Sequence, residues 1–180
     1  MELLNSDCIE SLARMNDSNV GLFMLDLPYG QTAELWDTQL DLSALWEQLL
    51  RVGTPTCSFL FFTTAKFGNS LINSKPDLFR YDCVWVKTRA IGWLQSGNQL
   101  MRKHELIYVF SKPKSTYNPQ LTEGKPYTSK VKAGSWNQTY RHLQVENSTV
   151  ENQGTRQPTS VLEFPQPNIA DRIHSTQKPV

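Results

Sequence analysis

The sequence predicts an α/β fold, built as a three-layer sandwich around a mostly parallel sheet. Two continuous apolar runs, residues 20–25 and 58–62, are typical of strands buried in such a sheet. Between them, residues 42–52 carry apolar side chains at helical spacing, which gives the alternation of strands and helices that a parallel sheet requires. The chain has 180 residues, 39% of them apolar, and is therefore expected to be about one domain with a sizeable core.

The other elements follow from the same patterns. Asp7 is placed to cap a short helix, because its side chain can accept hydrogen bonds from the first helical turn. The strand at residues 106–110 is expected to be antiparallel to its neighbour, since only a short lead-in precedes it. In chain order, the expected elements are strands at 3–4 and 20–25, helices at 9–15 and 42–52, a strand at 58–62, a helix at 67–72, and strands at 81–86, 106–110 and 161–164.

The most informative stretch is Leu25-Asp26-Leu27-Pro28-Tyr29-Gly30, directly after the first long apolar run. An acidic residue, a proline and an aromatic residue therefore lie at the carboxyl end of a predicted strand, which is where open α/β sheets bind ligands. A carboxylate and main-chain carbonyls can accept hydrogen bonds from an amino group, and a tyrosine ring can stack on a flat ring. This combination predicts an enzyme that holds an amino-bearing base and acts on its nitrogen.

Two short motifs resemble those of the DNA amino-methyltransferases. Residues 26–29, Asp-Leu-Pro-Tyr, are similar to the catalytic signature Asp-Pro-Pro-Tyr. Residues 174–179, His-Ser-Thr-Gln-Lys-Pro, resemble the His-Pro-Thr-Gln-Lys-Pro segment of the permuted branch, in which the catalytic strand precedes the cofactor-binding half. Trp36-Asp37, Trp85-Val86-Lys87 and the segment 104–110 lie between them in the order that this branch shows. The resemblance covers nearly the whole chain and implies a Rossmann-like methyltransferase fold.

The resemblance implies transfer of a methyl group to an exocyclic amino group of a base in double-stranded DNA. The implied catalytic residues are Asp26, Leu27, Pro28 and Tyr29. The Asp26 carboxylate and the Leu27 carbonyl would accept the two amino hydrogens, Pro28 would fix the turn, and Tyr29 would stack on the base after it leaves the duplex. An aspartate rather than a serine at the head of the signature favours adenine over cytosine. Leucine in place of the second proline keeps the carbonyl but loses the fixed φ.

The implied cofactor is S-adenosylmethionine, and no metal is expected. The implied cofactor-binding residues are Asp7, Asp26, His174, Thr176 and Lys178, with Lys178 paired to the methionine carboxylate. Two of them have simpler alternatives: Asp7 as a plain helix cap, and His174 as a surface histidine.

The chain departs from the family pattern in one larger respect. In this branch a glycine-rich turn, Asp-Pro-Phe-x-Gly-x-Gly, follows the Gln-Lys-Pro segment and cradles the cofactor, and this sequence contains no such turn. We therefore expect residues 1–180 to form a partial catalytic domain with an incomplete sheet and an exposed apolar edge. Activity would then need a second polypeptide or a missing carboxyl-terminal half. The alternatives are a catalytically inactive module that binds DNA or a partner protein and, less favoured, an RNA methyltransferase.

The charges are unevenly distributed along the chain. The formal net charge is only +1, but residues 84–141 hold ten Lys/Arg and two Asp/Glu, a net charge of +8. Such a basic segment is expected to face a polyanion, although a solvated loop would also carry lysines. Basic residues interleaved with an aromatic residue suit phosphate contacts and base stacking. The candidate DNA-binding residues, most of them in an expected loop at 88–103, are Lys87, Arg89, Trp93, Arg102 and Lys103.

The segment 111–167 is rich in Pro, Ser, Thr, Asn, Gln and Lys and is expected to be a long loop with one short strand near its end. The resemblance places the variable target-recognition segment here. Trp36 is left open between the target-base pocket and a core position. The sequence has no apolar stretch of membrane-spanning length and no metal-ligand spacing among its three cysteines, and its amino terminus is not expected to direct export, which favours a reducing cytoplasm. The resemblance to phage and bacterial enzymes implies that this is the cytoplasm of a bacterial host cell.

Overall fold

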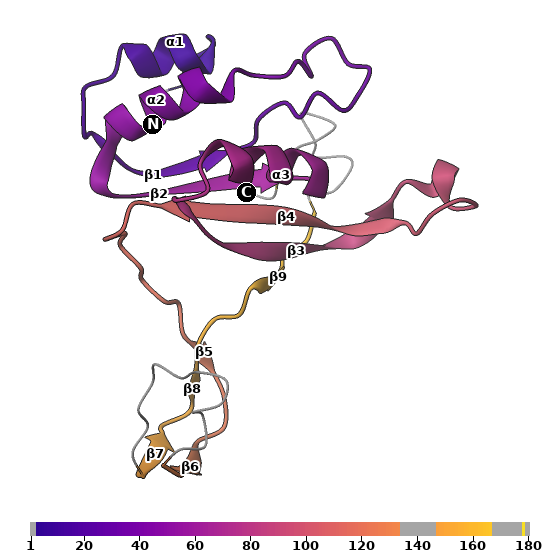
Figure 1. Cartoon of the computed structure of the whole chain (residues 1–180). Coiled ribbons are helices and arrows are strands. Elements are labelled where there is room, and N and C mark those ends of the chain that lie inside the picture. Colours follow the sequence, from indigo (N-terminus) through magenta and orange to yellow (C-terminus); the bar gives the residue numbers. More distant parts are fainter. Residues whose placement is uncertain (1–2, 134–146, 167–177, 179–180) are drawn as a thin grey trace. The chain divides into compact units, whose positions relative to one another are not determined.

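The computed structural model describes residues 3–133, 147–166 and 178, which fall into two compact units (Figure 1). The larger unit comprises residues 1–116 and 160–180, and the smaller unit comprises residues 117–159.

A five-stranded sheet, in the order β1-β2-β4-β3-β9, forms the centre of the larger unit. Its strands are β1 (Val20–Leu25), β2 (Gly53–Thr63), β3 (Phe79–Ile91), β4 (Arg102–Ser111) and β9 (Val161–Glu163). The pairs β1–β2 and β3–β9 are parallel, whereas β2–β4 and β3–β4 are antiparallel. The α/β class and the antiparallel β4 are confirmed. Across the described strands, however, the sheet is mixed rather than mostly parallel, because β3 and β4 are joined as a hairpin without a crossover helix.

Three helices accompany the sheet: α1 (Cys8–Ala13), α2 (Leu42–Val52) and α3 (Ala65–Ser74). The predicted cap of α1 is confirmed, since the Asp7 carboxylate accepts hydrogen bonds from the amides of Ile9 (2.9 Å) and Glu10 (3.0 Å). Asp41 caps α2 and Thr64 caps α3 in the same way. In the described part of the chain, no helix has the length and apolarity needed to span a membrane.

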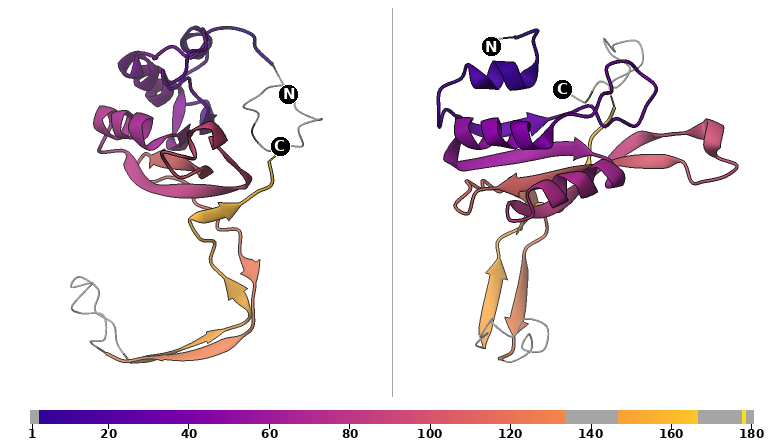
Figure 2. Two further views of the ribbon diagram at one scale, coloured as in Figure 1. Left: turned by 90° about the vertical axis from the view of Figure 1, so that its right-hand side faces the viewer. Right: turned by 45° about the horizontal axis from the view of Figure 1, so that its top comes forward.

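The described helices pack on one face of the sheet (Figure 2). Trp46 of α2 contacts Phe59 and Phe61 of β2, with ring centroids 5.5 and 5.2 Å apart. The core of this face consists of Leu12, Phe23, Leu27, Leu45, Trp46, Leu49, Val52, Cys57, Phe59, Phe61, Phe67, Leu71, Leu78 and Phe110. Because side chains alternate along a strand, the neighbouring strand residues point to the opposite face. Among the described residues, helices therefore cover one face of this sheet.

The opposite face carries a smaller apolar cluster contributed by strands alone. Phe62, Trp85 and Ile107 are buried in it. Toward β1 this face is open, and Leu22 and Met24 are 57% and 62% exposed. The expected apolar exposure is thus present, but it lies on a sheet face rather than only at a sheet edge.

Two local predictions differ from the structure. The strand expected at residues 3–4 is absent, and both leucines there are exposed rather than packed on the core. The loop expected at 88–103 is shorter, because β3 continues to Ile91 and β4 begins at Arg102. The connection contains a short 3-10 helix, η1 (Trp93–Gln95). The extended ends of β3 and β4 carry polar and basic residues, so no apolar pattern in the sequence marks them as strands.

The smaller unit contains two short antiparallel ladders where a long loop was expected. β5 (Thr122–Glu123) pairs with β8 (Thr155–Arg156), and β6 (Tyr127–Val131) pairs with β7 (Ser148–Asn152). The side chains of these strands are mostly exposed, so no apolar alternation marks them in the sequence. The Arg156 guanidinium lies 4.9 Å from the centre of the Tyr127 ring and links the two ladders.

Candidate active site

The candidate site lies at the edge of the sheet where β1 and β2 end. Leu25, the last residue of β1, is paired with Phe61 near the end of β2. Because β4 runs antiparallel to β2, with Thr63 opposite Leu106, β4 passes this edge near its beginning. This register places Glu105 beside the residues that follow β1.

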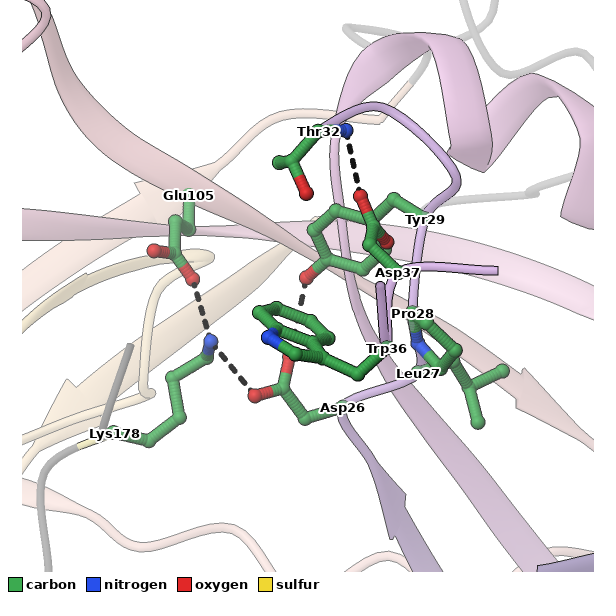
Figure 3. Close-up of a pocket in the computed structure, with 9 residues that line it drawn as sticks. All are labelled: Asp26, Leu27, Pro28, Tyr29, Thr32, Trp36, Asp37, Glu105 and Lys178. Carbon is green, nitrogen blue, oxygen red and sulfur yellow. Dashed lines mark hydrogen bonds and ion pairs between the residues drawn. The ribbon is translucent and has the colours of Figure 1, made fainter. Parts of the chain in front are cut away.

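The Asp26 carboxylate has two partners in the site (Figure 3). The Lys178 ammonium lies 2.9 Å from Oδ2, and the Tyr29 hydroxyl donates a hydrogen bond to Oδ1 over 3.2 Å. The Asp26 side chain remains 41% exposed, so solvent also reaches it. Lys178, in turn, lies 3.4 Å from Glu105 and 5.1 Å from the centre of the Phe62 ring.

Tyr29 is held between the sheet edge and α3. Its ring lies 5.3 Å from the ring of Phe67, centroid to centroid, with 30° between the planes. Burial, followed by the nearby negative charges of Asp26 and Glu105, raises the pKa of Tyr29 far above its usual range. The phenol therefore stays neutral and acts as a hydrogen-bond donor to Asp26.

Asp37 organises the loop that follows the catalytic stretch. Its carboxylate accepts hydrogen bonds from the amides of Gly30 (2.8 Å), Gln31 (2.9 Å) and Thr32 (2.7 Å). A hydrogen bond from the Thr32 side chain, together with these amides, holds the pKa of Asp37 far below its usual value. Gly30 has φ +62, a left-handed conformation that glycine adopts without strain.

Glu105 is a second acidic residue of the site, and it forms an ion pair with Lys87. The Lys87 side chain is only 6% exposed, and its ammonium lies 5.3 Å from the centre of the Trp85 ring. The sequence prediction placed Lys87 among the phosphate-binding residues. The structure instead buries its charge against Glu105, so this lysine is not available to a polyanion.

A cavity of about 400 Å³ joins these groups. It is lined by Asp26, Leu27, Pro28, Tyr29, Thr32, Trp36, Asp37, Glu105 and Lys178. The Leu27 side chain is buried in the core and points away from the other lining side chains, so Leu27 offers its main chain to the cavity (Figure 3). Trp36 is half exposed and lines the cavity, so it is not a core residue.

The arrangement has a definite chemical character. Carboxylates and main-chain groups can accept hydrogen bonds from an amino group, two aromatic rings can contact a flat ring, and one ammonium can pair with an anion. The volume is within the range of small-molecule sites. Among the described ranges, no group of three or more His, Cys, Asp or Glu side chains could hold a metal ion.

The remaining predicted residues lie elsewhere. Asp7 is exposed and caps α1, while Arg89, Trp93, Arg102 and Lys103 are exposed on the β3–β4 hairpin. His174 and Thr176 lie outside the described residues. Of the predicted site residues, the structure brings together Asp26, Leu27, Pro28, Tyr29 and Lys178.

Sequence reasoning assigned no role to Glu105, whereas the resemblance placed Thr32 in the loop at 30–41 that flanks the target-base pocket. Glu105 follows Arg102, Lys103 and His104 in β4 and directly precedes the apolar run at 106–110, so in sequence it belongs to a charged lead-in and not to the strand interior.

Comparison with known proteins identifies the fold. No model of a known protein family matches the chain. The PvuII DNA methyltransferase (cytosine-N4-specific) superposes with a TM-score of 0.52 at 10% identity, over 90% of this chain and 56% of that one. The chain has a methyltransferase fold. The crystal structure of the M1.HpyAVI–SAM complex matches at a TM-score of 0.44 and 14% identity, over 66% of this chain and 55% of that one. The chain thus spans about half the length of these solved structures.

Proposed function

We propose that the chain is the catalytic part of an S-adenosylmethionine-dependent DNA methyltransferase that modifies the exocyclic amino group of adenine. The observation that carries this proposal is the Asp26 carboxylate beside Tyr29 and Trp36 in one cavity, at the carboxyl end of β1 in a methyltransferase fold. The likeness to the methyltransferase signature at residues 26–29 supports it independently.

The chemistry requires hydrogen-bond acceptors around an amino group. The lone pair of such an amine is delocalised into the base, so the nitrogen is a poor nucleophile until its hydrogens are held in a tetrahedral arrangement. The Asp26 carboxylate and the main chain of Leu27, both lining the cavity, are placed to accept these hydrogens. When the nitrogen forms its new bond to carbon it must release a proton, and the Asp26 carboxylate is placed to accept it.

The base would be held by stacking. It must leave the duplex to reach a cavity at the sheet edge, and aromatic rings commonly hold a base in that position. Tyr29 is fixed against Phe67 on one side, and Trp36 lines the cavity near it. Because the Tyr29 phenol is neutral and bonded to Asp26, it would also orient the carboxylate.

The cofactor fits the charged end of the cavity. When bound, S-adenosylmethionine supplies a methyl group attached to a positively charged sulfur. The rest of the cofactor leaves as a neutral thioether when the methyl group is transferred. Lys178 is the cation among the described lining residues that is able to pair with the carboxylate of this molecule. To do so it must leave Asp26, and its contact with Glu105 offers a second anionic partner during the change. Asp7, His174 and Thr176 remain proposed contacts on the resemblance alone.

DNA would lie along the exposed basic residues of the β3–β4 hairpin. Arg89, Arg102 and Lys103 are exposed there and can pair with phosphates, whereas Trp93 offers a ring for stacking. Lys87 is excluded from this set because of its buried ion pair.

The proposal is tested by methyl transfer from radiolabelled S-adenosylmethionine to unmethylated genomic DNA. Asp26→Ala is expected to lower the rate by about a hundredfold or more, as loss of a preorganised acceptor does. Asp77→Ala, another exposed aspartate of the same unit, should leave the rate unchanged. Equal and measurable rates for the two variants, with a completing polypeptide added if the chain alone is inactive, would refute the role of Asp26.

The identity of the labelled nucleoside decides between adenine and cytosine. We favour adenine because an aspartate stands at the head of the signature, although the PvuII enzyme is described as cytosine-N4-specific. Digestion of the labelled DNA and chromatography of the nucleosides should show label in N6-methyl-2′-deoxyadenosine. Label in N4-methyl-2′-deoxycytidine would overturn that assignment but preserve the reaction class.

A second candidate function is a catalytically inactive module that binds DNA or a partner protein. It is favoured by the direct pairing of Lys178 with Asp26, which occupies the acceptor that catalysis needs. Isothermal titration of the chain with S-adenosylmethionine separates the two functions. Micromolar binding supports the enzyme. DNA binding without cofactor binding supports the module, or an enzyme completed by a second polypeptide, and adding such a polypeptide should then restore cofactor binding.

A further inference from the structure

The β3–β4 hairpin extends beyond the rest of the sheet. The last pair between β2 and β4 is Thr63–Leu106, and β9 pairs with β3 only as far as Val86. Beyond these pairs β3 and β4 continue together to the pair Ile91–Arg102, and both figures show the hairpin projecting past the neighbouring strands (Figures 1 and 2). An unsupported extension of this kind needs a reason, because it buries little apolar surface.

The tip of this hairpin exposes large apolar side chains. Trp93, Leu94 and Leu100 are 71%, 80% and 94% exposed. Ile91 and Met101, at the base of the turn, are also exposed. Five large apolar side chains within eleven residues form a patch of the kind that marks an interaction site.

The tip is an ordered turn that presents these side chains. Gly92 has φ +89, and its carbonyl accepts a hydrogen bond from the Gln95 amide at 3.0 Å. The Trp93 carbonyl accepts hydrogen bonds from the Ser96 amide at 3.1 Å and from the Ser96 hydroxyl at 2.7 Å. The amide of Gln99 donates to the Gln95 carbonyl at 3.0 Å. These bonds are local to the turn, so the apolar side chains contribute little to holding it.

The flanks of the apolar tip are basic. Residues 88–104 contain three Lys/Arg and one His but no Asp or Glu. Arg89, Arg102 and Lys103 are exposed on the two strands that lead to the tip. An apolar tip between cationic strands is complementary to a duplex, which has phosphates outside and stacked base pairs inside.

The hairpin starts at the edge that holds the candidate active site. Glu105 lines the cavity, and Arg102 is three residues before it on β4, so the two lie about 10 Å apart along the strand. Base pairs are separated by about 3.4 Å. A duplex that delivers a base into the cavity therefore has base pairs within about three steps of Arg102, where the turn that carries the tip begins.

We propose that the tip residues Trp93, Leu94 and Leu100 insert into the duplex beside the target base and fill the space that the base leaves. Arg89, Arg102 and Lys103 would hold the phosphates on either side. This inference deepens the proposed function, on which it rests, by naming the residues that keep the base out of the stack. Apolar wedges inserted at base steps are an established way to hold a deformed duplex.

The test compares two labelled duplexes of the same sequence, one intact and one with a single abasic site. An abasic site offers the space without the cost of unstacking, so the unaltered chain should bind that duplex about tenfold more tightly. Affinities are measured by fluorescence anisotropy over a range of salt concentrations.

Two variants separate the tip from its flanks. Leu94→Ser/Leu100→Ser should bring the preference for the abasic duplex close to one and leave the salt dependence unchanged, since no charge is altered. Arg102→Gln/Lys103→Gln should weaken binding to both duplexes equally and reduce the salt slope by about two. All four side chains are exposed, and circular dichroism should confirm that both variants fold.

Three outcomes would overturn the inference. One is equal affinity of the unaltered chain for both duplexes, and another is a preference that survives in the leucine variant. The third is binding to vesicles of anionic phospholipid that depends on the two leucines while DNA binding does not, which would assign the tip to a lipid surface. If methyl transfer fails both with and without a completing polypeptide while the abasic preference persists, the proposed enzyme is refuted but the role of the tip in DNA binding is not.

Discussion

The Lys178 ammonium lies 2.9 Å from the Asp26 carboxylate and 3.4 Å from that of Glu105, and so bridges two acidic side chains of one cavity. The position next to Asp26 is the one that an amino group bonded to this carboxylate would occupy. Substrate binding at Asp26 therefore requires the ion pair to open. Because Asp26 is 41% exposed, solvent screens the pair and the cost of opening it is small.

A double-mutant cycle measures that cost. Lys178→Met and Asp26→Asn, singly and together, should show a coupling free energy of unfolding below about 1 kcal/mol, as expected of a partly exposed pair. Urea unfolding of the four proteins gives the value, which should fall further at high salt. A coupling of several kcal/mol would instead identify the pair as a structural lock and would count against displacement by a substrate.

The ion pair between Glu105 and Lys87 should behave differently, because Lys87 is only 6% exposed. Glu105→Gln leaves a buried ammonium without its carboxylate and is expected to lower the free energy of unfolding by about 3–5 kcal/mol. The matched control is Glu105→Gln combined with Lys87→Met, which removes the unpaired charge and should recover most of the loss. If the single change costs less than about 1 kcal/mol, then Lys87 finds solvent in solution and its assignment to the interior is wrong.

The hydrogen bonds of Asp37 should make the stability of the loop at residues 30–37 sensitive to acid. Hydrogen bonds lower the pKa of Asp37 in the folded protein below the ordinary value of 3.8. Its contribution to stability is therefore complete above pH 3.8 and is lost as the pH falls toward the lowered pKa. Asp37→Asn should lower the melting temperature at pH 7 and flatten its dependence on pH in the acid range. An unchanged acid profile in this variant would show that other carboxylates dominate.

The strands and helices of the larger unit followed from the sequence wherever burial and periodicity agree. Residues 42–52 form α2 with the predicted bounds, since Leu45, Trp46 and Leu49 carry the helical period into the core. The apolar runs at 20–25 and 58–62 are strands as predicted, although only Phe23 of β1 is buried. What patterning could not supply was what covers each face of the sheet, because apolar residues on both faces of a strand do not say which element packs on them.

The sequence predicted Asp26 and Tyr29 of the candidate site, but it did not predict the ion pair of Glu105 with Lys87. Asp26 and Tyr29 are neighbours in the chain, and the end of a strand is a known place for ligands. Glu105 reaches them only through the antiparallel register of β4 on β2, which no local pattern specifies. Lys87 is buried because the same register brings it to Glu105 and because it packs against the Trp85 ring. The sequence alone therefore led to its assignment as a phosphate contact.

The open sheet face predicts association. Leu22 and Met24 expose apolar surface on the face away from the described helices, and burying such side chains is favourable by about 1.5–3 kcal/mol each. Sedimentation velocity should show a concentration-dependent shift to larger species. Leu22→Ser/Met24→Ser should raise the dissociation constant at least about tenfold. Leu35→Ser makes a similar change at a more exposed leucine away from this face, and it should leave association unaltered. A monomer that persists at high concentration would mean that this apolar surface tolerates water without a partner.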